Sequence, residues 1–172
     1  FLNEARDSVK VMTRMIGDIL GLARIGIDPG GFEPCDLNDL VEEARRAIDF
    51  GDEHLDVEPL PTVMGHPGQL VRVFQNLLDN AVKYAEPTRP LLVRIRSPRP
   101  NSVTVQDNGQ GFDIRSSAHV FTLFHRLDPT ASEGSGIGLS VVKKVIQLHG
   151  GSIRADVALG RGATFTIEFP NS

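Results

Sequence analysis

Phe74-Gln75-Asn76-Leu77-Leu78-Asp79-Asn80-Ala81-Val82-Lys83-Tyr84 is the stretch of the sequence that decides the fold. At 3.6 residues per turn, its apolar side chains fall on one face of a helix and its polar side chains on the other. The polar face carries Asn76, Asn80, Lys83 and Tyr84, and the two asparagines are spaced so that their carboxamides project side by side. Such a face is either a solvated surface or one wall of a pocket for a metal ion and phosphates, because amide oxygens suit a hard cation and a lysine suits phosphate. The rest of the chain decides between these alternatives.

Length and composition limit the class of protein. The 172 residues suit one domain of ordinary size with an appendage, and an apolar fraction of 40% is enough for a core. A net charge of −4 gives no reason to expect a nucleic acid as partner. The single cysteine, Cys35, fits a reducing cytosol, and no apolar run approaches the ~18–20 residues of a membrane span. Because the chain begins with Phe1, we expect a cytoplasmic piece of a longer protein, whose membrane anchor or sensor module would lie outside this sequence.

Residues 1–28 predict one long helix. A stripe of apolar and small side chains recurs at alternating spacings of three and four, which is the seam of a coiled coil or helical bundle: Leu2, Ala5, Val9, Met12, Ile16, Ile19 and Ala23. A stripe this narrow favours a partner helix, as in a homodimer, over packing on the helix's own domain. Asp28-Pro29-Gly30-Gly31 then ends the helix, so that residues 29–35 form a linker and residues 36–172 the main domain.

The remaining pattern predicts an α+β domain. Helices are expected from Asp36 to about Asp49, from Pro67 to about Ala85, and from the glycines before Leu139 to about His149. Alternating or short apolar runs predict extended segments at 55–58, 91–96, 102–106, 153–157 and 163–169. Residues 113–133 are mostly polar, which is typical of a lid. The element order predicts a two-layer sandwich, in which a mixed, mostly antiparallel sheet is covered on one face by three helices.

Three glycine clusters, at 109–111, 134–138 and 160–162, each lie at a junction next to regular structure. Glycine lets a backbone approach a ligand closely, and a helix that begins at a glycine-rich turn can bind an anion. The middle cluster lacks the Gly-Lys-Ser/Thr ending of a Walker A loop, and no parallel βαβ unit surrounds it as in a dinucleotide fold. One such cluster is weak evidence. Three clusters, an amide-bearing helix and Asp107 at the end of a strand form a much more specific set.

These segments resemble a known family. Asn76–Tyr84, Asp107–Phe112, Phe121–Phe124, Gly134–Leu139 and Gly160–Phe165 are similar, in order, to the N, G1, F, G2 and last glycine boxes of the GHKL (Bergerat) ATP-binding fold, in its histidine kinase branch. The helix at 1–28 resembles the second helix of the dimerisation and histidine-phosphotransfer hairpin that precedes such domains. The segments Phe121–Leu127 and Lys143–Gly151 resemble phytochrome-type sensor kinases.

The resemblance implies roles for individual residues in binding ATP and Mg²⁺. Asp107 would accept a hydrogen bond from the adenine amino group, and Gly109 and Gly111 would let the backbone pass the base. Asn76 and Asn80 would bind Mg²⁺ and, with Lys83, form the catalytic set that orders the phosphates. The backbone and side chains expected around the rest of the nucleotide are Tyr84, Phe112, Gly134, Ser135, Gly136, Ile137, Gly138, Leu139 and Thr164. Residues 113–133 would be the ATP lid, with Arg126 as the cation that reaches the γ-phosphate.

Asn76 separates a kinase from an ATPase within this family. The GHKL ATPases have a glutamate at this position, which activates water, whereas a carboxamide cannot accept a proton from water at neutral pH. The γ-phosphate is then kept for a histidine acceptor, and transfer relies on positioning and charge neutralisation. The family's acceptor lies on a preceding helix, and the five histidines of this chain are instead expected at the surface: His54, His66, His119, His125 and His149. His66 also departs from the aspartate usual before this helix.

The sequence therefore predicts the Mg-ATP-binding catalytic domain of a two-component sensor histidine kinase. Its partners would be ATP, a histidine-bearing phosphotransfer helix absent from this chain, and a response regulator of the parent protein. The isolated chain is expected not to phosphorylate itself. Two alternatives stay open: a kinase-like scaffolding module that acts by binding partners, and a GHKL ATPase or serine kinase. The intact Asp107, Asn80 and glycine boxes oppose the first, and Asn76 opposes the ATPase.

Overall fold

The computed structural model describes residues 31–48, 50, 54–111, 120–121 and 137–171. The predicted helix over 1–28, most of the 113–133 segment and Gly134–Gly136 lie outside these residues. The described helices are α2 (Leu37–Ala47), α3 (Pro67–Lys83) and α4 (Gly138–Leu148). The described strands are β1 (Glu33–Asp36), β2 (Leu55–Val57), β3 (Thr62–Gly65), β4 (Val93–Arg99), β5 (Ser102–Asp107), β6 (Ser152–Ala158) and β7 (Gly162–Glu168).

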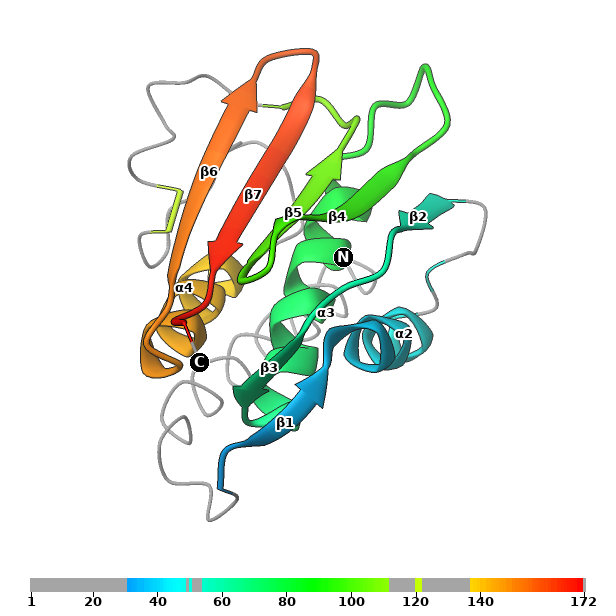
Figure 1. Cartoon of the computed structure of the whole chain (residues 1–172). Helices are drawn as coiled ribbons and strands as arrows, with labels where there is room; N and C mark the ends of the chain where they lie inside the picture. The colour runs from blue at the N-terminus through cyan, green and yellow to red at the C-terminus, as the bar shows by residue number, and fades with distance from the viewer. Residues whose placement is uncertain (1–30, 49, 51–53, 112–119, 122–136, 172) are drawn as a thin grey trace, which may run out of the picture.

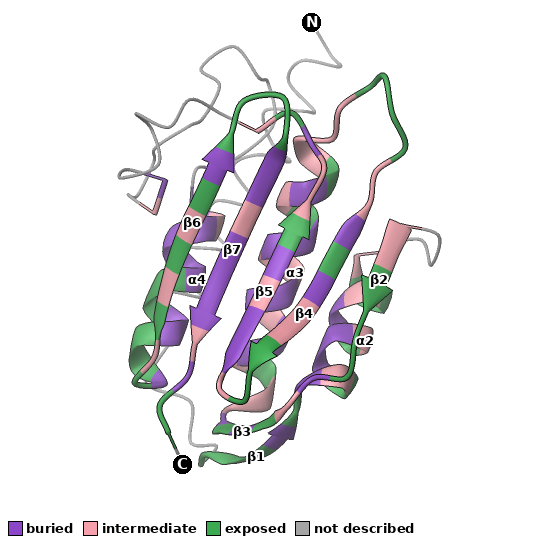
Figure 2. Cartoon of the chain, turned by 45° about the horizontal axis from the view of Figure 1, so that its top comes forward, coloured by how far each residue is buried: buried purple, intermediate pink, exposed green. Residues whose placement is uncertain are grey.

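Five strands form the main sheet in the order β2-β4-β5-β7-β6. β2 runs parallel to β4, and all other neighbours are antiparallel. The three helices lie together against one face of this sheet (Figures 1 and 2). The prediction of an α+β sandwich with a mixed, mostly antiparallel sheet and three covering helices is confirmed.

Periodicity explains how each layer contributes to the core. In α3, Leu70, Phe74, Leu77 and Leu78 are almost completely buried, so the apolar face read from the sequence is the face that meets the sheet. Along β6 and at the start of β4, more and less buried side chains alternate (Figure 2), because successive side chains point to opposite faces. The central strand β7 is buried along most of its length. Asp36 caps α2, as predicted, by accepting a hydrogen bond from the backbone N–H of Asn38 at 2.8 Å.

A two-stranded sheet, β1 paired with β3, was not predicted from the sequence. It is antiparallel and places Cys35 opposite Val63. Both side chains are buried, and the Cys35 thiol donates to the carbonyl of Gly65. This small sheet connects the start of the described chain to the segment that leads into α3.

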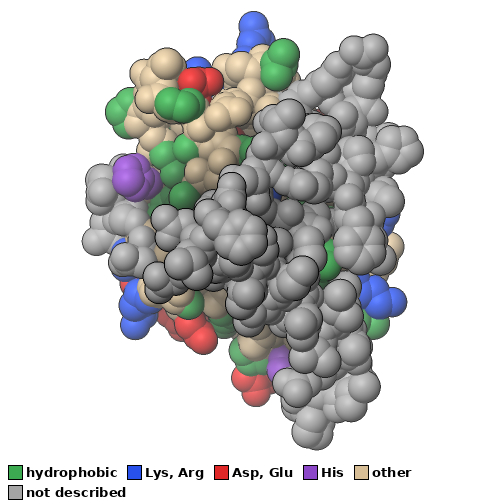
Figure 3. All heavy atoms as spheres, turned by 180° about the vertical axis from the view of Figure 1, so that it is seen from behind, with side chains coloured by type: hydrophobic (Ala, Val, Ile, Leu, Met, Phe, Trp, Pro, Cys, Tyr) green, Lys and Arg blue, Asp and Glu red, His purple; other side chains and the backbone are tan. Residues whose placement is uncertain are grey.

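The helix-covered side of the molecule can be inspected in Figure 3. In the described part of that side, acidic and basic side chains gather in small separate groups, with no large patch of one sign. No helix among the described residues is both long and apolar enough to cross a membrane.

Candidate functional site

Asp107 is the last residue of β5, opposite Val93 of β4. Its Oδ1 accepts two backbone hydrogen bonds, from the N–H of Gly109 at 2.8 Å and from the N–H of Ala163 at 3.2 Å. Burial raises the pKa of this carboxyl above its ordinary value, and the two hydrogen bonds act in the opposite direction. Asp107 is thus a desolvated carboxylate with one oxygen fixed by the backbone, as expected of a group that recognises a single polar partner.

Gly162 lets the β6–β7 hairpin pack directly against Asp107. Its φ is 88°, and a Cβ there would lie 2.1 Å from the carbonyl oxygen of Asp107 and 2.9 Å from its Oδ1. No larger side chain fits this position. Gly162, in the last glycine cluster, therefore allows the close packing that brings the N–H of Ala163 to the Asp107 carboxylate.

The loop after Asp107 is attached to the segment that follows α3. The N–H of Gln110 donates to the carbonyl of Tyr84 at 2.8 Å, and the Gln110 side chain donates to the carbonyl of Ala85 at 3.0 Å. Asn108 accepts from the N–H of Leu92 through its side-chain oxygen at 2.8 Å. The polar end of α3 and the loop beside Asp107 are therefore one hydrogen-bonded unit.

Asn76 lies at the contact between α3 and α4. Its side-chain nitrogen donates to the carbonyl of Arg72 at 2.8 Å, which turns its oxygen toward α4. A Cβ on Gly138, the first residue of α4, would be 2.8 Å from that oxygen. The structure thus brings together two positions from separate motifs of the sequence.

The remaining polar residues of α3 continue toward the loop after Asp107. Asn80 is half-buried, and its side chain makes no hydrogen bond to the described residues. The Lys83 ammonium lies 4.7 Å from the centroid of the Tyr84 ring, a cation–π distance. The predicted row of Asn76, Asn80, Lys83 and Tyr84 therefore runs from the start of α4 to the loop beside Asp107.

The start of α4 presents backbone rather than side chains to this region. Ile137 and Leu139 are buried in the core, so either residue could meet a ligand only through its backbone. Ser140 donates its hydroxyl to the carbonyl of Ile137 at 2.6 Å, and no side chain caps the helix. The first backbone N–H groups of such a helix suit an anion.

A family model described as "Histidine kinase-, DNA gyrase B-, and HSP90-like ATPase" matches residues 65–172, more than half of the chain. The chain belongs to this family. It is similar to Cyanobacterial phytochrome A of Nostoc sp., with 33% identity over 99% of this chain and 23% of that protein. Among solved structures, a mycobacterial sensor histidine kinase MprB is 29% identical, with a TM-score of 0.65 over 81% of this chain and 97% of the MprB chain. ShkA, solved in complex with AMPPNP, is 25% identical, with a TM-score of 0.71 over 96% of this chain and 37% of ShkA.

The family and these relatives identify the chain as an ATP-binding catalytic domain of the sensor histidine kinase type. The chain spans only about a quarter of the length of the phytochrome. Of the residues predicted to bind ATP, Phe112, Arg126, Gly134, Ser135 and Gly136 lie outside the described part of this kinase domain.

Two further predicted residues lie beside Asp107 in the kinase domain. Thr164 pairs with Gln106 across β5 and β7, one residue after the Ala163 whose N–H reaches Asp107. Gly111, with φ of 63°, lies close to the carbonyl of Ala158 at the end of β6. Neither residue touches the carboxylate in the described contacts, but both belong to the segments that flank it.

The prediction that His149 lies at the surface is wrong. The ring is only 3% exposed, its Nε2 accepts the N–H of His66 at 3.0 Å, and its Nδ1 lies 2.8 Å from the carbonyl of Val145. Phe32 stacks on it, with ring centroids 4.8 Å apart. Its position at a helix end suggested exposure, but the β1–β3 sheet, which was not predicted, brings Phe32 and the β3–α3 junction over it. His66, at the position before α3, provides no side-chain cap for this helix.

Sequence reasoning also missed Arg89. Its guanidinium donates to three backbone carbonyls: Nε to Asn108 at 2.7 Å, and Nη2 to Gly109 at 2.8 Å and Gly160 at 2.9 Å. Arg89 belongs to none of the five motifs, and no local pattern in the sequence marks it. Only the fold brings its turn, the loop after Asp107 and the β6–β7 hairpin to one place.

Proposed function

We propose that this domain binds Mg-ATP and donates the γ-phosphoryl group to a histidine on a phosphotransfer helix. The observation that carries the proposal is the arrangement around Asp107. The polar row on α3 joins the first turn of α4, at Asn76 and Gly138, to the loop beside the desolvated Asp107 carboxylate, and the family model covers all three. The AMPPNP complex of ShkA supports a nucleotide in the equivalent fold.

The adenine end of the nucleotide is assigned to Asp107. Its Oδ1 is already held by the N–H groups of Gly109 and Ala163, so Oδ2 is the oxygen that accepts the adenine amino group. A charged acceptor in a partly desolvated place discriminates strongly between a donor and an acceptor on the base. Gly109, Gly111 and Thr164 complete this end of the site.

The phosphate end is assigned to α3 and α4. The Asn76 and Asn80 oxygens are hard donors that fit Mg²⁺, and the Asn76 nitrogen is already used by the Arg72 carbonyl, which leaves its oxygen for this role. Bound Mg²⁺ would neutralise charge on the phosphates. Lys83 supplies a second positive charge, and the N–H groups at the start of α4 supply donors. Asn76 offers no base for water, so the site holds the γ-phosphate for an acceptor.

The remaining assignments concern the parent protein. We propose that residues 1–28 form a partial phosphotransfer helix that supports a homodimer, that 29–35 form a linker, and that 36–172 form the catalytic domain. The acceptor histidine and the response regulator then belong to other segments or chains, and the domain acts in the cytoplasm. The Phe112, lid Arg126 and Gly134–Gly136 roles are proposed from the resemblance to the family.

Calorimetric titration with AMPPNP, with and without Mg²⁺, tests the nucleotide site. We expect binding that strengthens with Mg²⁺, and a loss of affinity of about tenfold or more in Asp107→Asn, which removes the charge and turns an acceptor into a mixed donor and acceptor. Arg94→Gln, an exposed position on β4, serves as the control and should leave the affinity unchanged. Absence of binding by the wild type would overturn the proposal, and equal binding by Asp107→Asn would overturn the adenine role.

A further inference from the structure

We propose that Arg89 is a positioning residue for Asp107 and so sets the selectivity of the site for adenine. This inference rests on the proposed adenine role of Asp107. Arg89 lies in the turn after α3, where its N–H donates to the carbonyl of Glu86 at 3.3 Å, with Pro87 as the second residue of the turn. The turn delivers the guanidinium to the two loops that flank Asp107.

The connection to Asp107 passes through a single peptide group. Arg89 Nε binds the carbonyl oxygen of Asn108 at 2.7 Å, and the N–H of the same peptide, on Gly109, donates to Asp107 Oδ1 at 2.8 Å. In a trans peptide the C=O and N–H point in opposite directions. Fixing the carbonyl on one side therefore aims the N–H at the carboxylate on the other side.

The next peptide is fixed in the same way. Arg89 Nη2 binds the carbonyl of Gly109 at 2.8 Å, while the N–H on Gln110 donates to the carbonyl of Tyr84 at 2.8 Å. Both peptides of the turn after Asp107 are thus held at both ends. A positively charged donor on a carbonyl also polarises the peptide and strengthens the bond that its N–H makes.

The third contact of Arg89 reaches the second donor to Asp107. Nη2 binds the carbonyl of Gly160 at 2.9 Å, in the β6–β7 hairpin, and Ala163 of that hairpin donates to Asp107 Oδ1. One guanidinium therefore spans the loop and the hairpin that together hold the carboxylate. No ion pair joins Arg89 to an acidic side chain within the described ranges, so these carbonyls are its partners.

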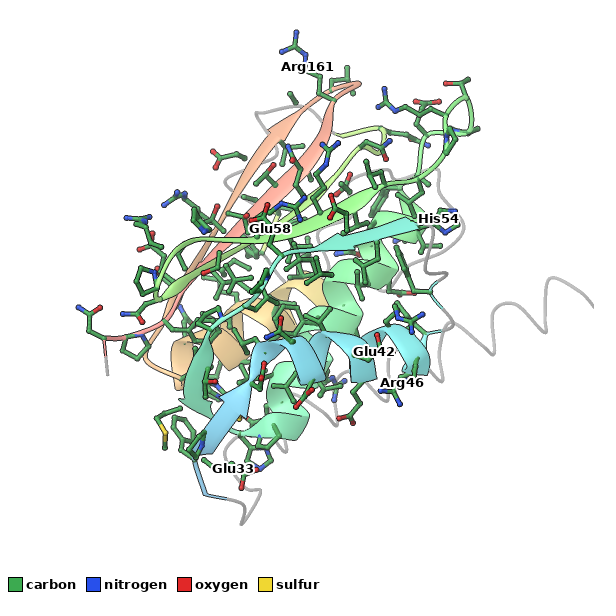
Figure 4. All side chains as sticks on the ribbon, turned by 45° about the vertical axis from the view of Figure 1, so that its right-hand side comes forward. Glu33, Glu42, Arg46, His54, Glu58 and Arg161 are labelled. Carbon is green, nitrogen blue, oxygen red and sulfur yellow. The ribbon has the colours of Figure 1, made fainter. Side chains whose placement is uncertain are left out.

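A planar guanidinium is suited to this task, and a lysine is not. Arg offers several N–H donors in a fixed fork, whereas an ammonium is a point charge on a flexible stem and cannot hold three carbonyls of this geometry. Arg161 provides a matched control. It lies on the same hairpin but projects outward from its tip, away from the body of the domain (Figure 4).

The test compares calorimetric affinities for ADP and inosine diphosphate, in which an oxo group replaces the adenine amino group. For the wild type we expect ADP to be preferred by about tenfold or more, and Asp107→Asn to remove this preference. Arg89→Met should reduce the ratio of ADP affinity to inosine diphosphate affinity by about threefold or more, because the Asp107 carboxylate is no longer held in one orientation. Arg89→Lys should reduce this ratio as well, and Arg161→Met should leave it unchanged.

Failure of the Arg89 inference and failure of the proposed adenine role of Asp107 give different results in this test. An Arg89→Met or Arg89→Lys protein that keeps the full preference, even with both affinities reduced, would overturn the inference, since the arginine would then only support the fold. A wild type without any preference would instead overturn the adenine role of Asp107. Thermal unfolding of each variant establishes that the folded protein is titrated, and Arg89→Lys keeps the test available if Arg89→Met does not fold.

Discussion

Asn76 and Gly138 are the residues at which the proposed metal end of the site depends on helix packing. The Asn76 oxygen faces the first residue of α4 because its nitrogen is bonded within α3. The glycine leaves room for that oxygen, and any side chain at 138 would need the same space. The orientation of the carboxamide is therefore set by two helices together, and not by the α3 sequence alone.

Gly138→Ala tests this orientation. The added Cβ would lie 2.8 Å from the Asn76 oxygen, the movable end of a side chain, so Asn76 should turn away while the fold persists. Helix propensity favours alanine by about 1 kcal/mol, and this gain offsets the cost of displacing the Asn76 side chain. We therefore expect little net change in the free energy of unfolding. Affinity for AMPPNP should fall about tenfold with Mg²⁺ and stay near the wild-type value without it. Calorimetry in both conditions measures this difference.

Gly68→Ala is the control for the glycine substitution. Gly68 lies in the first turn of α3, where an added Cβ would have ordinary contacts, the nearest with the His66 ring at 3.9 Å. It should leave nucleotide binding unchanged with or without Mg²⁺. If Gly138→Ala also kept its full Mg²⁺-dependent affinity, Asn76 would not be a metal ligand.

At the scale of single residues, local motifs were enough to propose roles for Asp107, Asn76 and Asn80, because each proposed role depends on a side chain and its immediate neighbours. Arg89 and His149 could not be predicted in this way. Arg89 binds carbonyls 19 to 71 positions away, and its function arises only where three segments meet. His149 follows a helix, a place where exposure is usual, and it is buried by a strand pair at the other end of the described chain.

The junction of α4 with β3 and α3 contains a histidine held in its neutral form. The carbonyl of Val145 can only accept, so Nδ1 carries the proton and Nε2 is left to accept the N–H of His66. A second proton, on Nε2, would point at the N–H of His66 and would remove the acceptor of that hydrogen bond. Burial lowers the pKa of His149 most, and the nearby His66 lowers it further, against the opposing effect of the Val145 carbonyl.

The stability of the domain should therefore depend on pH through His149. A lowered pKa means that the folded state binds fewer protons than the unfolded state, so stability is full above about pH 6.5 and falls as the pH drops from there toward the lowered pKa. The slope from this group is at most about 1.4 kcal/mol per pH unit. Urea unfolding at pH 7.5 and pH 5.5 measures the difference.

His149→Gln should reduce this difference and, by removing a buried hydrogen-bond partner, lower the free energy of unfolding at pH 7.5 by about 1–3 kcal/mol. Gln147→Ala, at an exposed position on the same helix, should keep the wild-type pH dependence. An unchanged difference between the two pH values in His149→Gln would show that another group is responsible.

At the scale of elements, the ends of the long periodic segments were predicted to within about three residues. α3 ends at Lys83 rather than Ala85, and β4 continues to Arg99. The pair β1 and β3 was missed because each strand has four residues, Pro34 interrupts the first, and their partner lies far away in sequence. Short strands are stabilised by their pairing and by burial of Cys35 and Val63, which a local pattern does not contain.

At the scale of the whole molecule, the sandwich connects the loop after β5 to the end of α3, and the polar row of α3 to the start of α4. The core residues on the helix-covered face hold these elements in register. The first histidine of this sequence is His54, inside the proposed catalytic domain. The proposed phosphate donor and the acceptor histidine are therefore expected on separate segments.

The most direct test of this account uses γ-labelled ATP, Mg²⁺ and the whole chain, with and without a separate protein that carries a histidine phosphotransfer hairpin. We expect acid-labile label on the hairpin protein, none on this chain, and release of inorganic phosphate no faster than in a buffer control when the hairpin is omitted. Asp107→Asn should reduce the transfer to the hairpin. Steady release of phosphate by the chain alone would contradict the account, because it would show that water, and not a histidine, is the acceptor.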